Sequence, residues 1–356
     1  MAQQHLDPTD PMAATVTGDA LAGYLRAQAT EFLRALRQHR ETGAGGNGSE
    51  ESVDAARALR RSARRISGSL HTFRPLLDPD WSEGMRPELA WLSGTLALEH
   101  AYAARLERLL NALHRLSGSP ALPSQPTGST PPAAPTPERG TGNGTGTGTG
   151  NLTVGAAKAG ALLDRQLTLA RTRAHSAALQ ALGSSRFHAV ADKVAVLASE
   201  VPLTPTAATT DCRPLAAAAE ERLTDAVAAL PLLTAGHPYN AAALIHGLSP
   251  EPTPHSQDAP WHQVRLLLRL HRYSREVLDG TGAPVNVRLL AAGQALNRHR
   301  DASEAAAAAA AAARTPRIAP ATAYALGVLH ADQRHEVEAA RFAFQQSWQK
   351  QKITTP

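Results

Sequence analysis

Apolar residues recur along most of the chain at intervals of three and four, the spacing that places them on one face of a helix. The first such stripe, Leu25, Phe32, Leu33 and Leu36, predicts a helix over about residues 19–40. The same periodicity predicts further helices over about 50–73, 82–116, 154–201 (with a break at 183–185), 212–233, 259–279, 286–314 and 320–351. Few segments alternate with period two, so we predict an all-α fold.

Composition supports helices that pack closely around small side chains. Apolar residues make up 43% of the chain, whereas aromatic residues make up only 4%. Leucine, alanine and valine must therefore fill the interior, and these residues suit a helical core better than a sandwich or a barrel.

Two segments lack any helical pattern. Residues 1–16 are expected to form a loose tail. Residues 117–154 consist largely of proline, glycine, threonine and serine, and we expect a disordered insertion because they offer little apolar surface to bury. The remaining helices follow the same order twice, which predicts one helical repeat over 17–203 and a second over 204–351.

Each predicted repeat contains one strongly basic helix. The net charge of +5 is modest, but its distribution is uneven. Arg57, Arg60 and Arg64 lie on one face of the first basic helix, with Arg61 and Arg65 beside that face. The second basic helix carries His262, Arg265, Arg269 and Arg272 on one face, and Leu266, Leu267, Leu270 and Val277 are expected to form its apolar side.

The two basic faces correspond in spacing. Arg57, Arg60 and Arg64 precede His262, Arg265 and Arg269 by the same number of residues. Like charges three and four residues apart weaken a helix unless something neutralises them, and few acidic residues are interleaved here. A solvated surface would explain a single basic helix, but the matched pair favours an external anion.

The spacing of the arginines favours an anion that is itself a chain. Arginines one turn apart present guanidinium groups roughly every 5 Å along a helix, and a guanidinium forms forked hydrogen bonds to phosphate. A single small phosphate would favour a glycine-rich loop or a helix N-terminus. Neither basic helix carries surface aromatics on which nucleic-acid bases could stack, so we favour inorganic polyphosphate over RNA.

The chain resembles the conserved histidine α-helical domain (CHAD) family. The family pattern His-x-x-Arg-x-x-x-Lys/Arg-x-x-Arg-Tyr is matched in register by His262, Arg265, Arg269, Arg272 and Tyr273. Downstream, Gln294, Leu296 and Asp301 match a second pattern, in which Asn297 replaces a usual glycine. Asp301 is near Arg298 and Arg300 in sequence, and we expect it to orient or neutralise a neighbouring arginine rather than to act in acid–base catalysis. The first repeat is similar but altered: Arg60, Arg64, Arg65 and the string TFRPLLD (72–78) match, whereas Arg57 replaces the signature histidine and Ala101 replaces an aspartate.

This resemblance implies a fold and a function. Members of the family are built from two pseudo-symmetric four-helix bundles with a basic channel or groove between them, and they are associated with polyphosphate binding and with polyphosphate granules. The implied binding residues are Arg57, Arg60, Arg64, Arg65, His262, Arg265, Arg269, Arg272 and Tyr273. The N-terminal residues lack the pattern of a secretory signal, so we expect a cytoplasmic protein, which could lie on polyphosphate granules, and we expect no cofactor or metal.

Other interpretations of the sequence are weaker. The same basic faces could take RNA or an acidic protein partner, and phosphate release from polyphosphate would indicate a hydrolase. Cys212 is the only cysteine, which excludes an intrachain disulfide. No residues with the spacing of a metal site or a catalytic triad occur, and no apolar run is long enough to cross a membrane, so we expect a soluble, non-catalytic protein.

Overall fold

The computed structural model describes residues 15–44, 49–118, 147–237, 256–280, 282, 284 and 286–349. Its long helices are α1 (Gly18–Ala44), α2 (Ser49–Thr72), α3 (Pro79–Leu116), α4 (Thr147–Leu182), α5 (Ser185–Ser199), α6 (Arg213–Ala228), α9 (Ala259–Asp279), α10 (Val287–Ala313) and α11 (Pro320–Gln349). Shorter helical segments are η2 (Arg74–Leu76), α7 (Leu232–Ala235) and η3 (Ser256–Asp258). The described residues contain no strand beyond an isolated bridge between Leu77 and Leu203, so the all-α prediction is confirmed.

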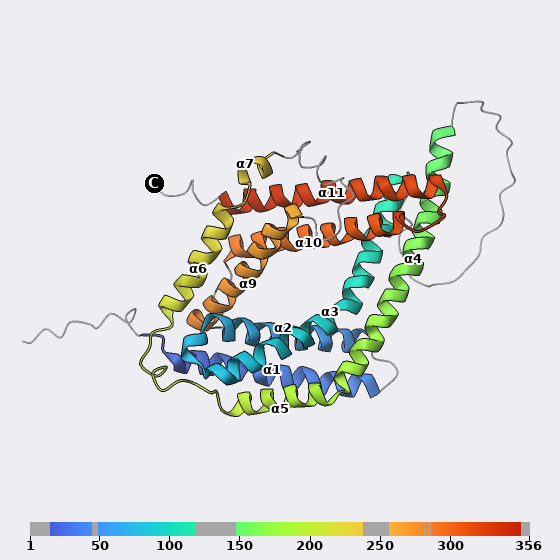
Figure 1. Cartoon of the computed structure of the whole chain (residues 1–356). Coiled ribbons are helices and arrows are strands. Elements are labelled where there is room, and N and C mark those ends of the chain that lie inside the picture. The colour runs from blue at the N-terminus through green and yellow to red at the C-terminus, as the bar shows by residue number, and fades with distance from the viewer. Residues whose placement is uncertain are drawn as a thin grey trace, which may run out of the picture.

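The helices are arranged as a four-sided frame (Figure 1). In this view α1, α2 and α5 form the lower side, α3 and α4 the right side, α10 and α11 the upper side, and α6 and α9 the left side. The basic helices α2 and α9, which are distant in sequence, contact each other where the lower and left sides meet.

Three apolar clusters stabilise this frame. The first is formed by α1, α2, α5 and the first half of α3, around Phe32, Phe73 and Phe187. The second joins the second half of α3 to parts of α4, α10 and α11, and the third joins α6, α7 and α9 to the remaining parts of α10 and α11, around Trp261 and Phe344. Because the middle cluster draws on both halves of the sequence, the expected division into two separate four-helix bundles is not confirmed.

Small residues allow the helices of the middle cluster to approach closely. Ala305, Ala309 and Ala312 of α10 are fully buried there. At Gly155, a Cβ atom would lie only 2.3 Å from the carbonyl oxygen of Ala321, so α4 and α11 meet backbone to backbone. The alanine-rich composition therefore sets the distance between the helices as well as their propensity to form.

The string TFRPLLD has a structural role in this fold. Pro75 lies in the first turn of η2, where the missing N–H of proline costs nothing. Asp78 caps α3, because its side chain accepts a hydrogen bond from the Trp81 N–H at 2.8 Å. Leu76 and Leu77 are buried in the first apolar cluster. This motif therefore fixes the turn between α2 and α3.

Three sequence expectations need comment. Residues 1–14 lie outside the described residues, but Val16 is attached to the fold, because its carbonyl accepts a hydrogen bond from the Cys212 N–H. Most of the expected insertion (119–146) also lies outside them, whereas Thr147–Val154 belongs to α4, so the helix begins earlier than predicted. Leu266 is 48% exposed, and Leu268 takes the apolar position instead.

Candidate functional site

Four arginines of the basic helices converge where α2 faces α9. Arg60 and Arg64 are one turn apart on α2, and Arg265 and Arg269 are one turn apart on α9. Arg64 lies close enough to Arg265 and Arg269 for their charges to influence one another's pKa. Arg300 of α10 belongs to the same group, and we call Arg60, Arg64, Arg265, Arg269 and Arg300 the inner cluster.

The charges of the inner cluster are poorly compensated. Burial, followed by the neighbouring arginines, lowers the pKa of Arg265 to about 9 and that of Arg64 to about 10. The pKa values of Arg60 and Arg269 are lowered in the same direction, again mainly by burial. All four guanidinium groups remain protonated at neutral pH, so their mutual repulsion is a cost that a bound anion would remove.

Hydrogen bonding shows the same lack of partners. Within the described residues, Arg60, Arg64 and Arg269 pair with no carboxylate, and the buried Nε atoms of Arg60 and Arg269 have no hydrogen-bond partner. A buried donor without an acceptor is costly. These groups are therefore available to the oxygen atoms of a ligand.

The other two members of the inner cluster are held by neighbours on α10. The Nε of Arg265 donates a hydrogen bond of 2.8 Å to the side-chain oxygen of Asn297, the residue that replaces the usual glycine of the family pattern. Arg300 pairs with Asp301 and lies 3.7 Å from Glu304. The prediction that Asp301 would neutralise a neighbouring arginine is thus confirmed. Sequence reasoning missed Arg300 itself as a site residue.

Arg57 lies at one end of the inner cluster. Its Nη1 donates to Asp54 at 2.8 Å, and its Nη2 lies 3.4 Å from the Nε2 of His100 on α3. Burial and the charges of Arg57 and Arg60 lower the pKa of His100. Arg57 is therefore partly neutralised within its own helix, unlike Arg60 and Arg64.

His262, the signature histidine of the second repeat, lies beside the inner cluster. Its Nε2 is 3.5 Å from the Ser303 hydroxyl, and its ring meets the ring of His299 edge to face at 5.5 Å. Burial lowers the pKa of His262, so the imidazole is neutral at pH 7. It can therefore offer a hydrogen bond but no charge at that pH.

Arg65, Arg272 and Tyr273 differ in position from the other predicted residues. Arg65 makes a forked ion pair with Glu276, at 2.7 and 3.2 Å, and Glu276 also accepts a 2.8 Å hydrogen bond from the Tyr24 hydroxyl. Arg272 lines a cavity to which no inner-cluster arginine contributes. Tyr273 lies between the two regions, since its ring contacts Arg65 and its hydroxyl influences Arg64.

A buried ionic network fixes the start of α9, and sequence reasoning did not identify it. Asp258, only 2% exposed, pairs with Arg334 at 2.8 Å and with Arg341 at 2.7 Å, both from α11. His299 lies 3.5 Å from the same carboxylate. Burial raises the pKa of Asp258, but the neighbouring His299 and Arg334 outweigh this effect and hold that pKa well below its usual value. The network positions His262, one turn further along α9.

The comparisons with known proteins agree with the resemblance seen in the sequence. The family model described as CHAD domain matches residues 27–310. The solved structure of PptA from Streptomyces chartreusis is 72% identical in sequence, with a TM-score of 0.76, and the match covers 94% of this chain and all of that one. The crystal structure of the CHAD domain from the plant Ricinus communis matches 95% of this chain and 97% of that one, at 15% identity and a TM-score of 0.48.

A search of curated proteins finds no significant match. The family model, however, spans most of the chain and includes α2, α9 and α10, the three helices that carry the inner cluster. The chain therefore belongs to the CHAD domain family.

Proposed function

We propose that this protein binds inorganic polyphosphate at the inner cluster. The observation that carries the proposal is the convergence of Arg60 and Arg64 with Arg265 and Arg269 from a distant part of the chain. None of these four arginines has a carboxylate partner among the described residues, although Arg265 donates to the amide oxygen of Asn297. A polyanion would remove the repulsion among them and satisfy their unpaired donors.

The geometry favours a chain of phosphates over an isolated one. Successive arginines on each helix are separated by one turn, or roughly 6 Å of helix axis, and two such rows face the same region. A linear anion with closely spaced charges can contact both rows at once. Membership of the CHAD family supports the same ligand, because the family resemblance implies polyphosphate binding. A location on polyphosphate granules is part of the proposal.

The proposed activity is binding without catalysis. Guanidinium groups stay protonated at neutral pH, so they stabilise negative charge but do not serve as a general base. His262 is held beside Ser303 and His299, and we assign it a supporting hydrogen bond to the ligand. Arg57 is a further supporting contact at the end of the inner cluster. Arg65, Arg272 and Tyr273 are expected to contribute less than the inner cluster.

Charge reversal within the inner cluster provides the direct test. We expect the double variant Arg265→Glu, Arg269→Glu to lose detectable polyphosphate binding in a filter-binding or calorimetric assay, because it replaces two cations by two anions at the site. Far-ultraviolet circular dichroism should remain helical. The matched control is Arg171→Glu, Arg173→Glu, which makes the same charge change on the exposed face of α4. Equal binding by both variants would remove the inner cluster from the site.

Competition identifies the ligand class. At one fixed salt concentration, unlabelled polyphosphate should displace labelled polyphosphate at a lower concentration of phosphate units than single-stranded RNA does. Preferential displacement by RNA would favour a nucleic-acid-binding function instead. Release of free phosphate from polyphosphate in the presence of magnesium would contradict the non-catalytic assignment.

A further inference from the structure

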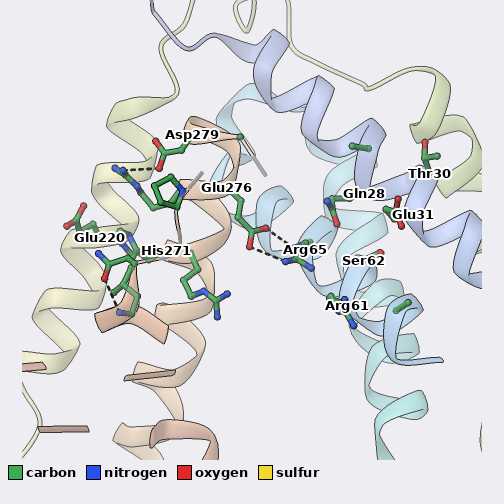
Figure 2. A pocket seen from close by; sticks show the side chains of 18 residues that line it. Gln28, Thr30, Glu31, Arg61, Ser62, Arg65, Glu220, His271, Glu276 and Asp279 are labelled. Carbon is green, nitrogen blue, oxygen red and sulfur yellow. Dashed lines mark hydrogen bonds and ion pairs between the residues drawn. The ribbon is translucent and has the colours of Figure 1, made fainter. Parts of the chain in front are cut away.

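A cavity of about 1350 Å³ lies on the other side of the contact between α2 and α9. Helices α1 and α2 form one wall, and α6 and α9 form the opposite wall (Figure 2). None of the inner-cluster arginines lines it. Its volume exceeds the ~300–1,000 Å³ that is usual for small-molecule sites, so a ligand of that class would share the cavity with water.

Buried polar side chains line this cavity without partners in the protein. Gln28, Ser62 and His271 are only 5–7% exposed. Within the described residues their side chains make no hydrogen bond, and the Nδ1 of His271 is fully buried. Figure 2 shows Gln28 and Ser62 on one wall and His271 on the other. Buried polar groups are normally hydrogen-bonded, so the Nδ1 of His271 is an exception. Gln28 and Ser62 offer unpaired donors and acceptors to the cavity that they line.

Charged residues of both signs line the same cavity, and some of them are already paired. The ion pair of Arg65 with Glu276 spans the two walls, as Figure 2 shows, and Arg275 pairs with Asp279 at 2.9 Å. Three charged groups have no ion-pair partner among the described residues, and they are Arg61, Glu220 and Arg272. The cavity thus offers unpaired charges of both signs.

The arrangement of these groups indicates the ligand. Glu220 lies beside His271 on the wall formed by α6 and α9. Arg61 lies on the α2 wall opposite, as Figure 2 shows. Arg272 of α9 also lines the cavity. A carboxylate suits the two guanidinium groups, and an ammonium group suits Glu220. The neutral donors and acceptors of Gln28 and Ser62 suit an amide or a hydroxyl between the two ends.

We infer that this cavity is a second ligand site, which takes a zwitterion carrying a carboxylate and an ammonium group, of the size of an amino acid or a short peptide. Polyphosphate is a poorer candidate here than at the inner cluster, because the cavity lining carries as many carboxylates as guanidinium groups, four of each. The inference does not depend on polyphosphate binding at the inner cluster, since no inner-cluster arginine lines this cavity.

Matched dipeptides test the two ends of the ligand separately. The probes are alanyl-alanine, its N-acetyl derivative, which lacks the ammonium group, and its C-terminal amide, which lacks the carboxylate. Binding to the full chain is measured by saturation-transfer nuclear magnetic resonance and by calorimetry. We expect saturable binding of alanyl-alanine and at least a tenfold weaker affinity for each blocked form.

Variants assign each end to its wall. Arg61→Gln combined with Arg272→Gln should weaken alanyl-alanine binding about tenfold, the equivalent of ~1.4 kcal/mol. The same double variant should bind the C-terminal amide no more weakly than the unchanged protein does, because the amide lacks the carboxylate. Glu220→Gln should also weaken alanyl-alanine binding about tenfold. It should bind the N-acetyl form no more weakly than the unchanged protein does, because that form lacks the ammonium group. The inner-cluster variant Arg265→Gln, Arg269→Gln should bind the dipeptide normally, and so should the surface control Arg171→Gln, Arg173→Gln.

Several results would overturn the inference. The first is the absence of saturable binding at millimolar alanyl-alanine. The second is equal affinity for all three probes, and the third is weaker binding of only one of the two blocked forms. If polyphosphate displaced the dipeptide, or if the inner-cluster variant lost dipeptide binding, the dipeptide would bind at the inner cluster instead. Because polyphosphate binding is scored separately in every variant, failure of this site is distinguishable from failure of the proposed function.

Discussion

Arg64 and Arg65 are adjacent in sequence, but their guanidinium groups meet opposite surroundings. Arg64 faces other arginines and has no carboxylate partner among the described residues. Arg65 makes a forked ion pair with Glu276, whose carboxylate also accepts a hydrogen bond from the Tyr24 hydroxyl. We therefore expect the first arginine to act on a ligand and the second to hold α2 against α9.

Single substitutions should separate these two roles. Arg64→Gln should leave the melting temperature of the free protein unchanged or raise it, because it relieves repulsion, and should weaken polyphosphate binding about tenfold or more. Arg65→Gln should reduce the free energy of unfolding by about 1–3 kcal/mol, with a smaller effect on affinity. Thermal denaturation and calorimetry of both variants provide the measurements, and the opposite pattern would return Arg65 to the binding site.

His299 is a second residue whose surroundings determine its behaviour. It is 1% exposed, stacks on Trp261, and accepts a hydrogen bond from the Nε of Arg341. Burial is the main reason that its pKa falls to about 4. The unfolded chain, with an ordinary histidine pKa of about 6.5, therefore binds more protons than the folded protein between these two values.

Stability should consequently fall as the pH is lowered from about 6.5 to about 4. The contribution of His299 across this range is on the order of 3 kcal/mol. It is fully present above pH 6.5 and lost near pH 4. His299→Gln, which cannot titrate but can still accept a hydrogen bond from Arg341, should reduce this dependence. Denaturant unfolding at pH 7.0 and pH 4.5 measures it, and an unchanged pH dependence would contradict the assignment.

At the scale of elements, the contact between α2 and α9 decides which arginines meet. This contact is tight at Gly68, where a Cβ atom would lie 2.6 Å from the Cδ2 of Tyr273. Tyr273 also lies beneath Arg65 and near Arg64. Its ring therefore separates the inner cluster from the cavity behind it, and the distance between the two basic helices depends on a glycine at position 68.

A pair of helix glycines tests this packing. Gly68→Ala should destabilise the protein and weaken polyphosphate binding, because the added methyl group displaces the Tyr273 ring and separates α2 from α9. Gly23→Ala is the matched control. Gly23 lies in α1 with open space where its Cβ would be, so the same change should stabilise the helix by about 0.5–1 kcal/mol. Equal thermal shifts in the two variants would show that the contact at Gly68 is unimportant.

At the scale of the whole molecule, four long helices each belong to two apolar clusters. Helices α3, α10 and α11 cross from one cluster to the next, and α4 connects the middle cluster to the first. The positions of the sides of the frame are therefore coupled through shared helices (Figure 1). Among the described residues, no helix has the length and hydropathy needed to span a bilayer.

A rigid arrangement of positive charges predicts that the affinity for polyphosphate depends strongly on the salt concentration. If the five arginines of the inner cluster each release about 0.7 counterion per phosphate contact, a plot of log affinity against log salt should have a slope of about −3.5. Arg269→Gln should reduce the magnitude of that slope by about 0.7. Titrations with polyphosphate at several potassium chloride concentrations test this, and a slope near zero would exclude binding driven by these charges.

The sequence by itself determined the helices, the all-α class and the basic faces of α2 and α9, because helical periodicity and charge spacing are local properties. It also predicted that Asp301 would neutralise an arginine, since Arg300 is its neighbour. The family followed from the same local motifs, and the match over residues 27–310 confirmed it.

Only the tertiary structure decided which of the predicted residues share one site. Successive residues point about 100° apart around a helix, so Arg64 and Arg65 contact whichever helices pack on each side of α2. The groups that distinguish them, Arg269 and Arg300 near Arg64 and Glu276 beside Arg65, lie about two hundred residues away in the sequence, and no local pattern specifies them. The inclusion of Arg300, the separate position of Arg272 and the buried network of Asp258 all depend on such contacts, because packing between distant helices sets which charges are neutralised.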